Sequence, residues 1–358
     1  MESMGIRQVD RTFWKNKKVF LTGHTGFKGS WLTIWLHEMG ANVYGYSLRP
    51  PTNPSLFEFA NIQTFTNGEF NDICNLDILR KSMKSFNPEI LIHMAAQPLV
   101  RESYEDPLRT YDTNVIGTLN VLESARSCNN LKSVLVITTD KCYQNNEWDW
   151  GYREVDSLGG HDPYSSSKAC AELLTASYRS SFFKNSDVNI ATARAGNVIG
   201  GGDWAKDRLI PDILSAISKN NKIIVRNLDA IRPWQHVLEP LSGYLMLVED
   251  IYKFGNKFAE AWNFGPSNEN CRTVKEILSI FSSKYPKWVG WEEYKKEIVH
   301  EAKLLKLDCS KAINNLNWKP KWDLHTTIDL IISWQDKVNA NNKNTIDACL
   351  NDIRLFNN

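Results

Sequence analysis

The feature that most constrains the fold is a glycine-rich turn between a short strand and a helix. Lys17–Thr22 (KKVFLT) is rich in β-branched and aromatic residues, and a helical pattern runs from Gly26 to Met39. Residues 23–29 between them read GHTGFKG, a G-x-x-G-x-x-G sequence. Glycines at this spacing allow a tight turn, close backbone approach to a pyrophosphate and close helix–strand packing. The turn therefore predicts a dinucleotide-binding βα unit, with an ordinary tight βα turn as the alternative.

Strands and helices then alternate along the chain. Expected strands are 42–46, 89–93, 133–138 and 188–193, and expected helices are 76–86, 111–127 and 164–183. Such alternation is typical of βαβ units and a mostly parallel sheet with helices on both faces. We predict an α/β fold: a Rossmann-type doubly wound parallel sheet over 1–195, and a smaller, mixed α/β C-terminal substrate domain over 196–358. Segments near 235–265 are expected to return to the first domain, and the last residues to form a loosely held tail.

Composition excludes several classes of function. The formal net charge is +1 and no long Lys/Arg run occurs, which argues against a nucleic-acid partner or a membrane surface. No apolar stretch approaches the length of a membrane span. The seven cysteines are scattered and show no Cys-x-x-Cys spacing, so neither a disulfide framework nor a metal site is expected. The cytoplasm is the expected location.

The end of the second expected strand leaves the choice of dinucleotide open. A Rossmann fold usually has a carboxylate here, but residues 45–49 read GYSLR. Ser47 could hydrogen-bond a ribose 2′-hydroxyl, as in NAD. Arg49 could instead accept a 2′-phosphate, as in NADP, or be a solvated loop charge.

A phenol and an ammonium, Tyr164 and Lys168, are spaced to share one face of a helix. A lysine beside a tyrosine, in the field of a bound nicotinamide, is expected to lower the phenol pKa and make it a usable acid/base. Residues 138–143 (TTDKCY) follow an expected buried strand, so their side chains should emerge at the carboxyl end of the sheet, where such folds bind ligands. A Tyr/Lys pair at this spacing is also common by chance.

The order and spacing of several motifs resemble the extended short-chain dehydrogenases/reductases over nearly the whole chain. These motifs are the turn at 23–29, Asp72-Ile73, HMAA at 93–96, Asn114-x-x-Gly117-Thr118, Thr139 and Tyr164-x-x-x-Lys168. Longer strings resemble one branch, the CDP-glucose 4,6-dehydratases: GHTGFKGSW at 23–31, HMAAQPLVR at 93–101, DKCY at 140–143, GNVIGGGDW at 196–204 and RPWQHV at 232–237. Related dehydratases carry Asp-Glu where this chain has Asp140-Lys141, a departure that the CDP-glucose branch shares.

The resemblance implies a role for each matching residue. Residues expected to contact NAD are Gly23, Thr25, Gly26, Phe27, Gly29, Ser47, Arg49, Asp72, Ile73, Ala95, Ala96, Gln97, Tyr164 and Lys168. Residues expected to contact the sugar nucleotide are Asn197, Arg208, Leu209, Arg226, Arg232 and His236. Surface ion pairs are the alternative for Arg208 and Arg226, and a core position is the alternative for His236.

The activity implied by the resemblance is that of a hydro-lyase, which removes water from CDP-glucose to give CDP-4-keto-6-deoxyglucose. Thr139, Tyr164 and Lys168 would form the redox triad. Asp140 would protonate the departing C6 hydroxyl if a dry pocket keeps it protonated, and Lys141 would be the C5 base or stabilise the enolate. The alternatives are a nucleotide-sugar 4-epimerase and a non-catalytic dinucleotide-binding protein. The resemblance also implies a homodimer, formed by helices near 107–127 and 164–183, or a higher homo-oligomer. It further implies a product used in 3,6-dideoxyhexose formation for a bacterial surface polysaccharide.

Overall fold

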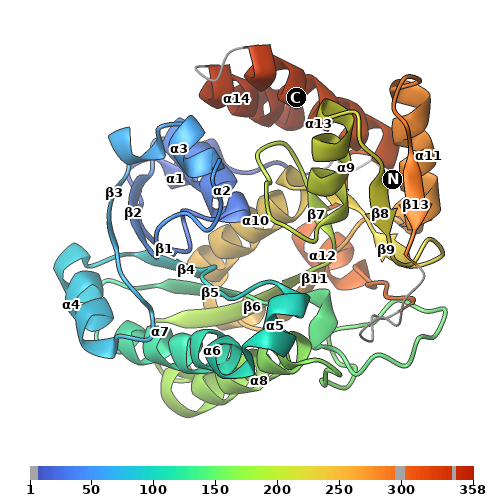
Figure 1. The fold of residues 1–358 in the computed structure, drawn as a ribbon. Helices are drawn as coiled ribbons and strands as arrows, with labels where there is room; N and C mark the ends of the chain where they lie inside the picture. The colour runs from blue at the N-terminus through green and yellow to red at the C-terminus, as the bar shows by residue number, and fades with distance from the viewer. Residues whose placement is uncertain (1–6, 295–302, 341–343) are drawn as a thin grey trace, which may run out of the picture.

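A central parallel sheet organises the computed structural model, which describes residues 7–294, 303–340 and 344–358 (Figure 1). Seven strands lie in the order β11-β6-β5-β4-β1-β2-β3, and every neighbouring pair is parallel. The strands are β1 (Lys18–Thr22), β2 (Asn42–Ser47), β3 (Asn67–Phe70), β4 (Ile90–His93), β5 (Ser133–Ile137), β6 (Asn189–Ala195) and β11 (Ala261–Phe264). This order reverses direction between β1 and β4, which makes the sheet doubly wound and confirms the predicted fold class.

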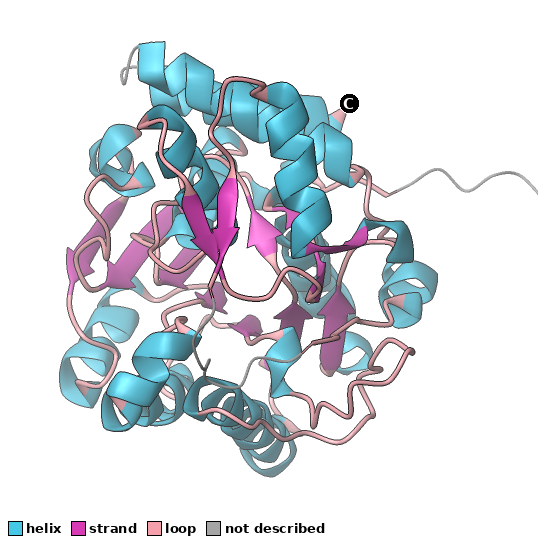
Figure 2. Cartoon of the chain, turned by 45° about the vertical axis from the view of Figure 1, so that its right-hand side comes forward, coloured by secondary structure: helices cyan, strands magenta, loops and turns pink. Residues whose placement is uncertain are grey.

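Helices cover both faces of the sheet (Figures 1 and 2). On one face α2 (Phe27–Glu38) and α10 (Leu238–Phe254) share a core cluster with apolar residues of β1, β4 and β5. On the other face α4 (Leu76–Phe86), α7 (Gly117–Ala125) and α8 (Pro163–Tyr178) contribute to a second cluster with alternate residues of the same strands. Successive side chains of a strand point to opposite faces of the sheet. Both sets are buried here, because helices cover both faces. Within the 235–265 segment, α10 and β11 pack with this sheet.

After β6 come smaller elements, which lie opposite the edge of the sheet formed by the carboxyl ends of its strands. Three two-stranded ladders pair β10 (Gln235–His236) with β7 (Val198–Ile199), β12 (Cys271–Thr273) with β9 (Ile231–Pro233), and β13 (Trp291–Glu293) with β8 (Ile223–Val225). A third apolar cluster joins Ile199 of β7 and Ile223 and Val225 of β8 to α9 (Leu209–Ser218), α11 (Val274–Lys284) and α13 (Leu324–Ala340). The remaining helices are α1 (Arg11–Trp14), α3 (Leu56–Phe59), α5 (Val100–Glu105), α6 (Pro107–Tyr111), α12 (Ser310–Leu316), α14 (Thr345–Asn357) and the short η1 (Ile62–Thr64), η2 (Asp112–Ile116), η3 (Asp140–Cys142), η4 (Arg179–Phe183), η5 (Gly255–Phe258) and η6 (Asn268–Asn270).

Three expectations about secondary structure differ from the structure. The last residues are no loose tail: they form α14, and the buried Phe356 ring meets Trp35 and Trp322 edge-on at 5.8 and 4.9 Å between centroids. The edge strand β3 was not expected, because its sequence NGEF is mostly exposed and has no apolar period. The expected helix over 111–127 is interrupted by the π-helical η2. Across the described residues, no helix is both long enough and apolar enough to span a membrane.

Candidate active site

The glycine turn brings the start of α2 close to the ends of β1 and β4. Gly23 has a φ of +78°, and a Cβ there would lie 2.6 Å from the backbone nitrogen of Ala95. A Cβ on Gly29 would overlap the Gly23 carbonyl oxygen. Gly26 caps α2 without a side-chain hydrogen bond, which leaves the first N–H groups of the helix available to an anion. A cradle that only glycine permits, facing a helix N-terminus, fits the pyrophosphate of a dinucleotide.

Ser47 and Arg49 lie beside this turn at the end of β2. The buried Ser47 hydroxyl is 3.0 Å from the Thr25 hydroxyl and 2.9 Å from His24 Nδ1. The exposed Arg49 guanidinium lies over the Phe70 ring, 5.1 Å from its centroid. Both side chains are therefore close to the predicted dinucleotide site, and neither contact discriminates NAD from NADP.

The expected adenine residues lie after β3. Asp72 is exposed, and its Oδ1 accepts a hydrogen bond from the Cys74 backbone N–H at 2.9 Å. Ile73 is buried against Gly117, where an added Cβ would lie 2.5 Å from Ile73 Cδ1. This contact explains the Gly117 of the motif, since any larger residue would displace Ile73.

The residues after β4 occupy the switch point of the sheet. The Ala95 N–H donates to the Thr22 hydroxyl at 3.2 Å, and Ala96 follows at partial exposure. The Gln97 amide donates to the Thr110 hydroxyl at 2.8 Å and to the Leu99 carbonyl at 3.1 Å. The Gln97 side chain thus fixes this segment internally, and a contact with the dinucleotide stays a prediction.

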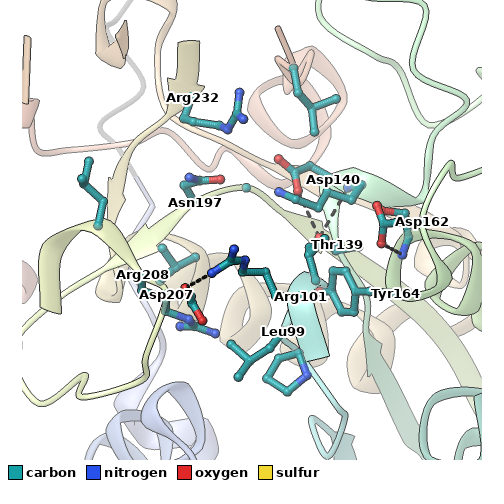
Figure 3. A pocket seen from close by; sticks show the side chains of 18 of the residues that line it. Leu99, Arg101, Thr139, Asp140, Asp162, Tyr164, Asn197, Asp207, Arg208 and Arg232 are labelled. Atoms are coloured by element: carbon teal, nitrogen blue, oxygen red, sulfur yellow. Dashed lines mark hydrogen bonds and ion pairs between the residues drawn. The ribbon is translucent and has the colours of Figure 1, made fainter. Parts of the chain in front are cut away.

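A cavity of about 1130 Å³ opens at the carboxyl ends of β5 and β6. One side carries the predicted catalytic residues, and the other carries the predicted substrate residues (Figure 3). The predicted residues that line it are Thr139, Asp140, Lys141, Tyr164, Asn197, Arg208, Leu209, Arg226 and Arg232. The structure therefore brings together in one cavity residues that are far apart in the sequence.

Thr139, Asp140 and Tyr164 form the centre of the catalytic side (Figure 3). Thr139 caps η3, and its hydroxyl donates to Asp140 Oδ1 at 3.0 Å. Asp140 is 1% exposed, and among the described residues none donates a hydrogen bond to its Oδ2. Lys141 is half-buried, and its backbone N–H is 3.4 Å from the Thr139 hydroxyl. A carboxyl oxygen without a protein partner at a cavity wall is suited to proton transfer to a bound substrate.

Burial raises the pKa of Tyr164 to about 12, while a hydrogen bond with Thr139 acts in the opposite direction. The chain alone therefore does not produce the expected lowering of the phenol pKa, and a lowering in the field of a bound nicotinamide stays a prediction. Burial lowers the pKa of Lys168 to about 8, although the Glu172 carboxylate opposes this shift. The Lys168 ammonium donates to the Ile137 carbonyl at 3.2 Å, which holds α8 against the end of β5.

A buried ion pair supports the catalytic loop from behind. Arg194 on β6 and Glu172 on α8 meet at 2.9 Å with side chains only 3% exposed. Glu172 also accepts hydrogen bonds from the Thr138 and Thr192 hydroxyls, and Arg194 donates to the Tyr143 hydroxyl at 2.8 Å. Burial alone would raise the pKa of Glu172, but Arg194 and the two hydroxyls lower it. This network fixes both ends of the loop that carries Thr139, Asp140 and Lys141.

The substrate side is rich in arginines that already have carboxylate partners. Arg208 pairs with Asp203 at 3.0 Å, and Arg226 lies 3.7 Å from Asp207. Both arginines line the cavity, as a substrate-binding residue would, and both are also ion-paired. The structure therefore does not decide between a substrate contact and a surface ion pair for either of them. Arg101 was missed by the sequence analysis, and it reaches across the cavity to pair with Asp207 at 2.8 Å (Figure 3). Its signal was the charged end of the string at 93–101.

The prediction for His236 needs correction. The side chain is 1% exposed and does not belong to the cavity lining. Its ring lies edge-on to Trp31 and Trp322, at 6.0 and 4.9 Å between centroids. His236 Nδ1 accepts from the Leu238 N–H at 3.3 Å, and burial lowers the pKa of the ring to about 3. His236 is a core histidine of β10, two residues before α10 begins, and the substrate contact is withdrawn.

No cluster of three or more His, Cys, Asp or Glu side chains suited to a metal ion occurs within 7–294, 303–340 and 344–358.

Comparison with known proteins agrees with this geometry. A family model described as GDP-mannose 4,6 dehydratase matches residues 20–331. The CDP-glucose 4,6-dehydratase of Salmonella typhimurium is 52% identical over 331 residues, covering 91% of this chain and 92% of the relative. Among solved structures, the dTDP-glucose 4,6-dehydratase of Bacillus anthracis in complex with NAD has a TM-score of 0.75 at 21% identity, covering 90% and 97% of the two chains. The UDP-glucose 4-epimerase of Thermotoga maritima has a TM-score of 0.78 at 19% identity, covering 90% and 99%. The chain is therefore a member of the GDP-mannose 4,6 dehydratase family, within the extended short-chain dehydrogenases/reductases.

Proposed function

We propose that the chain converts CDP-glucose to CDP-4-keto-6-deoxyglucose with NAD as its cofactor. The observation that carries this proposal is Asp140, hydrogen-bonded to Thr139 beside Tyr164, with an unpartnered oxygen at the wall of the cavity. A 4-epimerase needs the phenol and the lysine but has no use for an acid at C6. A protein that only senses a dinucleotide needs none of these groups. The 52% identity with a CDP-glucose 4,6-dehydratase, over nearly the whole of both chains, supports the same activity.

The chain's own residues divide the reaction into two proton-transfer tasks. The glycine turn at 23–29 would hold NAD, which would supply the hydride acceptor for C4 and the hydride donor for C6. Tyr164 takes the proton of the O4 hydroxyl, and Thr139 hydrogen-bonds the same oxygen. The C4 ketone acidifies the C5 proton, which Lys141 removes. Asp140 protonates the departing C6 hydroxyl, so water leaves across C5 and C6.

The arginines on the far side hold the sugar nucleotide. Asn197 and Arg232 would bind its diphosphate, and Arg208, Leu209 and Arg226 would clamp the base and phosphates; all five line the cavity. Guanidinium groups give multi-donor, charge-assisted hydrogen bonds to phosphate oxygens. Asp203 forms an ion pair with Arg208, and Asp207 forms ion pairs with Arg226 and Arg101. A diphosphate that binds to these arginines would therefore replace the two carboxylates as their partner.

Turnover on a panel of nucleotide sugars tests this function. The kcat/KM for CDP-glucose should exceed the values for ADP-, GDP-, UDP- and dTDP-glucose by on the order of 100-fold or more, since a site that hydrogen-bonds one base leaves polar groups unpaired with another. The product should absorb as an enolisable 4-keto sugar. Equal turnover of dTDP-glucose would contradict the CDP assignment, and a 4-epimer that retains its 6-hydroxyl would contradict the reaction.

NAD is favoured over NADP by the reaction cycle. The hydride taken from C4 is given back to C6, so a cofactor that stays bound serves the cycle. A hydrogen bond from the Ser47 hydroxyl to a ribose 2′-hydroxyl would suit the same choice.

We also infer a homodimer formed by the helices near 107–127 and 164–183. Large apolar side chains are exposed on these adjacent helices, which is unusual for a surface without a partner. They are Leu108, Tyr111, Ile116, Leu173 and Phe182. A second copy of the chain would cover them by pairing the same helices around a twofold axis.

A cytoplasmic location and a role in 3,6-dideoxyhexose formation for a bacterial surface polysaccharide complete the proposal. Free cysteines at all seven positions are compatible with a reducing compartment.

A further inference from the structure

Lys28 connects the dinucleotide turn with the substrate cavity. It is the second residue of α2, directly after Phe27, and its backbone belongs to the GHTGFKG turn. Its side chain nevertheless lines the cavity that also contains Asn197, Arg208 and Tyr164. Among the residues of the turn at 23–29, Lys28 alone is part of this lining.

The position of this ammonium is electrostatically unfavourable. The first turn of a helix favours acidic side chains because of the positive end of the helix dipole, yet the first turn of α2 has no acidic residue. Arg208, just before α9, and Lys168, on α8, both lower the pKa of Lys28 by their charge, and Asp140 on η3 acts in the opposite direction. Among the described residues, none accepts a hydrogen bond from the Lys28 ammonium. A basic residue in the first turn of a helix goes against this preference, and such an exception at a cavity wall indicates a functional site.

The direction in which the pKa of Lys28 is shifted agrees with this placement. Burial, followed by the charges of Arg208 and Lys168, lowers the pKa of Lys28 to about 7, against an opposing effect of Asp140. An anion that entered the cavity beside Lys28 would favour its charged form and raise this pKa again. The cavity therefore holds a lysine whose charge depends on the ligand.

We propose that Lys28 is an additional substrate-binding residue, whose ammonium contacts the diphosphate of the sugar nucleotide together with Arg208. The inference rests on the proposed function and adds a residue to its substrate site. Both the dinucleotide and the sugar nucleotide carry a diphosphate. The backbone N–H groups at the start of α2 serve the first, whereas the Lys28 side chain shares its cavity with the arginines that serve the second. One turn thus contacts both ligands, by backbone on one side and by side chain on the other.

Calorimetric titration of CDP into NAD-saturated enzyme tests the proposal. Lys28→Met should weaken CDP binding by about 10- to 100-fold, the effect of one charge-assisted hydrogen bond, with NAD affinity within about threefold of wild type. Lys28→Arg should recover most of the CDP affinity. Lys206→Met is the matched control, because Lys206 lines the same cavity at its exposed rim. The retained NAD affinity, together with an unchanged melting temperature, shows that Lys28→Met is folded.

Proton uptake gives a second readout. At pH 8, above the pKa of about 7, free Lys28 is largely neutral, so CDP binding to wild type should be accompanied by a measurable proton uptake. Titrations in buffers of different ionisation enthalpy measure this uptake, and Lys28→Met should abolish it.

Three results would overturn the inference. Lys28→Met that binds CDP as wild type does would exclude the contact. Loss of NAD affinity without loss of CDP affinity would assign the ammonium to the cofactor's diphosphate. Equal losses in Lys28→Met and Lys206→Met would indicate a general effect of charge. If wild type itself did not bind CDP, the proposed function would fail first, and the inference with it.

Discussion

Replacing Tyr164 with phenylalanine should lower the rate of C4 oxidation by about 100- to 10,000-fold, the usual effect of removing a general base. The change removes the phenol oxygen but little volume, and the ring remains packed where Tyr164 is 8% exposed. NAD binding and the melting temperature should therefore stay close to those of wild type. Reduced cofactor formed in a single turnover measures the oxidation step. A rate within a few-fold of wild type would show that another group accepts the O4 proton.

Replacing Asp140 with asparagine should separate oxidation from elimination. Asparagine keeps the hydrogen bond to the Thr139 hydroxyl but cannot protonate the C6 hydroxyl, and hydroxide is a poor leaving group. In a single turnover the variant should accumulate NADH and a 4-keto-hexose that retains its 6-hydroxyl, with formation of the 4-keto-6-deoxy product slowed by about 100-fold or more. Rapid-quench mass spectrometry and absorbance of the reduced cofactor measure the two species. A variant that forms no NADH would show that elimination is not the separate task of Asp140.

Lys141→Met is the matched comparison, because it changes the neighbouring residue on the same short helix, η3. It should slow the exchange of the C5 proton into heavy water while oxidation at C4 continues. If the proton exchanged at the wild-type rate, Lys141 would not be the C5 base.

The sheet could be predicted because its strands carry their own pattern. β1, β4 and β5 are short apolar runs between polar turns, and the sequence placed each within one residue of its observed bounds. The same pattern located the site, since Thr139 and Asp140 follow a buried strand and must emerge at its carboxyl end. β3 carries no such pattern, since its NGEF sequence is mostly polar and lies at an exposed edge of the sheet, where it pairs with β2.

The parts that the sequence did not yield depend on contacts between distant segments. His236 has the same sequence neighbours whether it faces a ligand or the core, and the rings of Trp31 and Trp322 decide that it is buried. The packing of α14 likewise depends on Trp35, far away in the sequence. The pair of Arg101 and Asp207 spans the cavity, so neither residue alone indicates it. Contacts between distant segments determine these features, so the hydrophobic pattern of a single strand or helix does not predict them.

The central claim is that one molecule of cofactor carries a hydride from C4 to C6 of the same sugar, and isotope transfer tests it most directly. CDP-glucose with deuterium at C4 should be converted in the presence of excess unlabelled NAD and NADH, and the product analysed by mass spectrometry and NMR. The account predicts that deuterium appears at C6 of the product, in the molecule from which it was removed. Mixing labelled with unlabelled substrate should give no crossover between product molecules. Loss of the label to the added cofactor, or a product that retains deuterium at C4, would contradict the account.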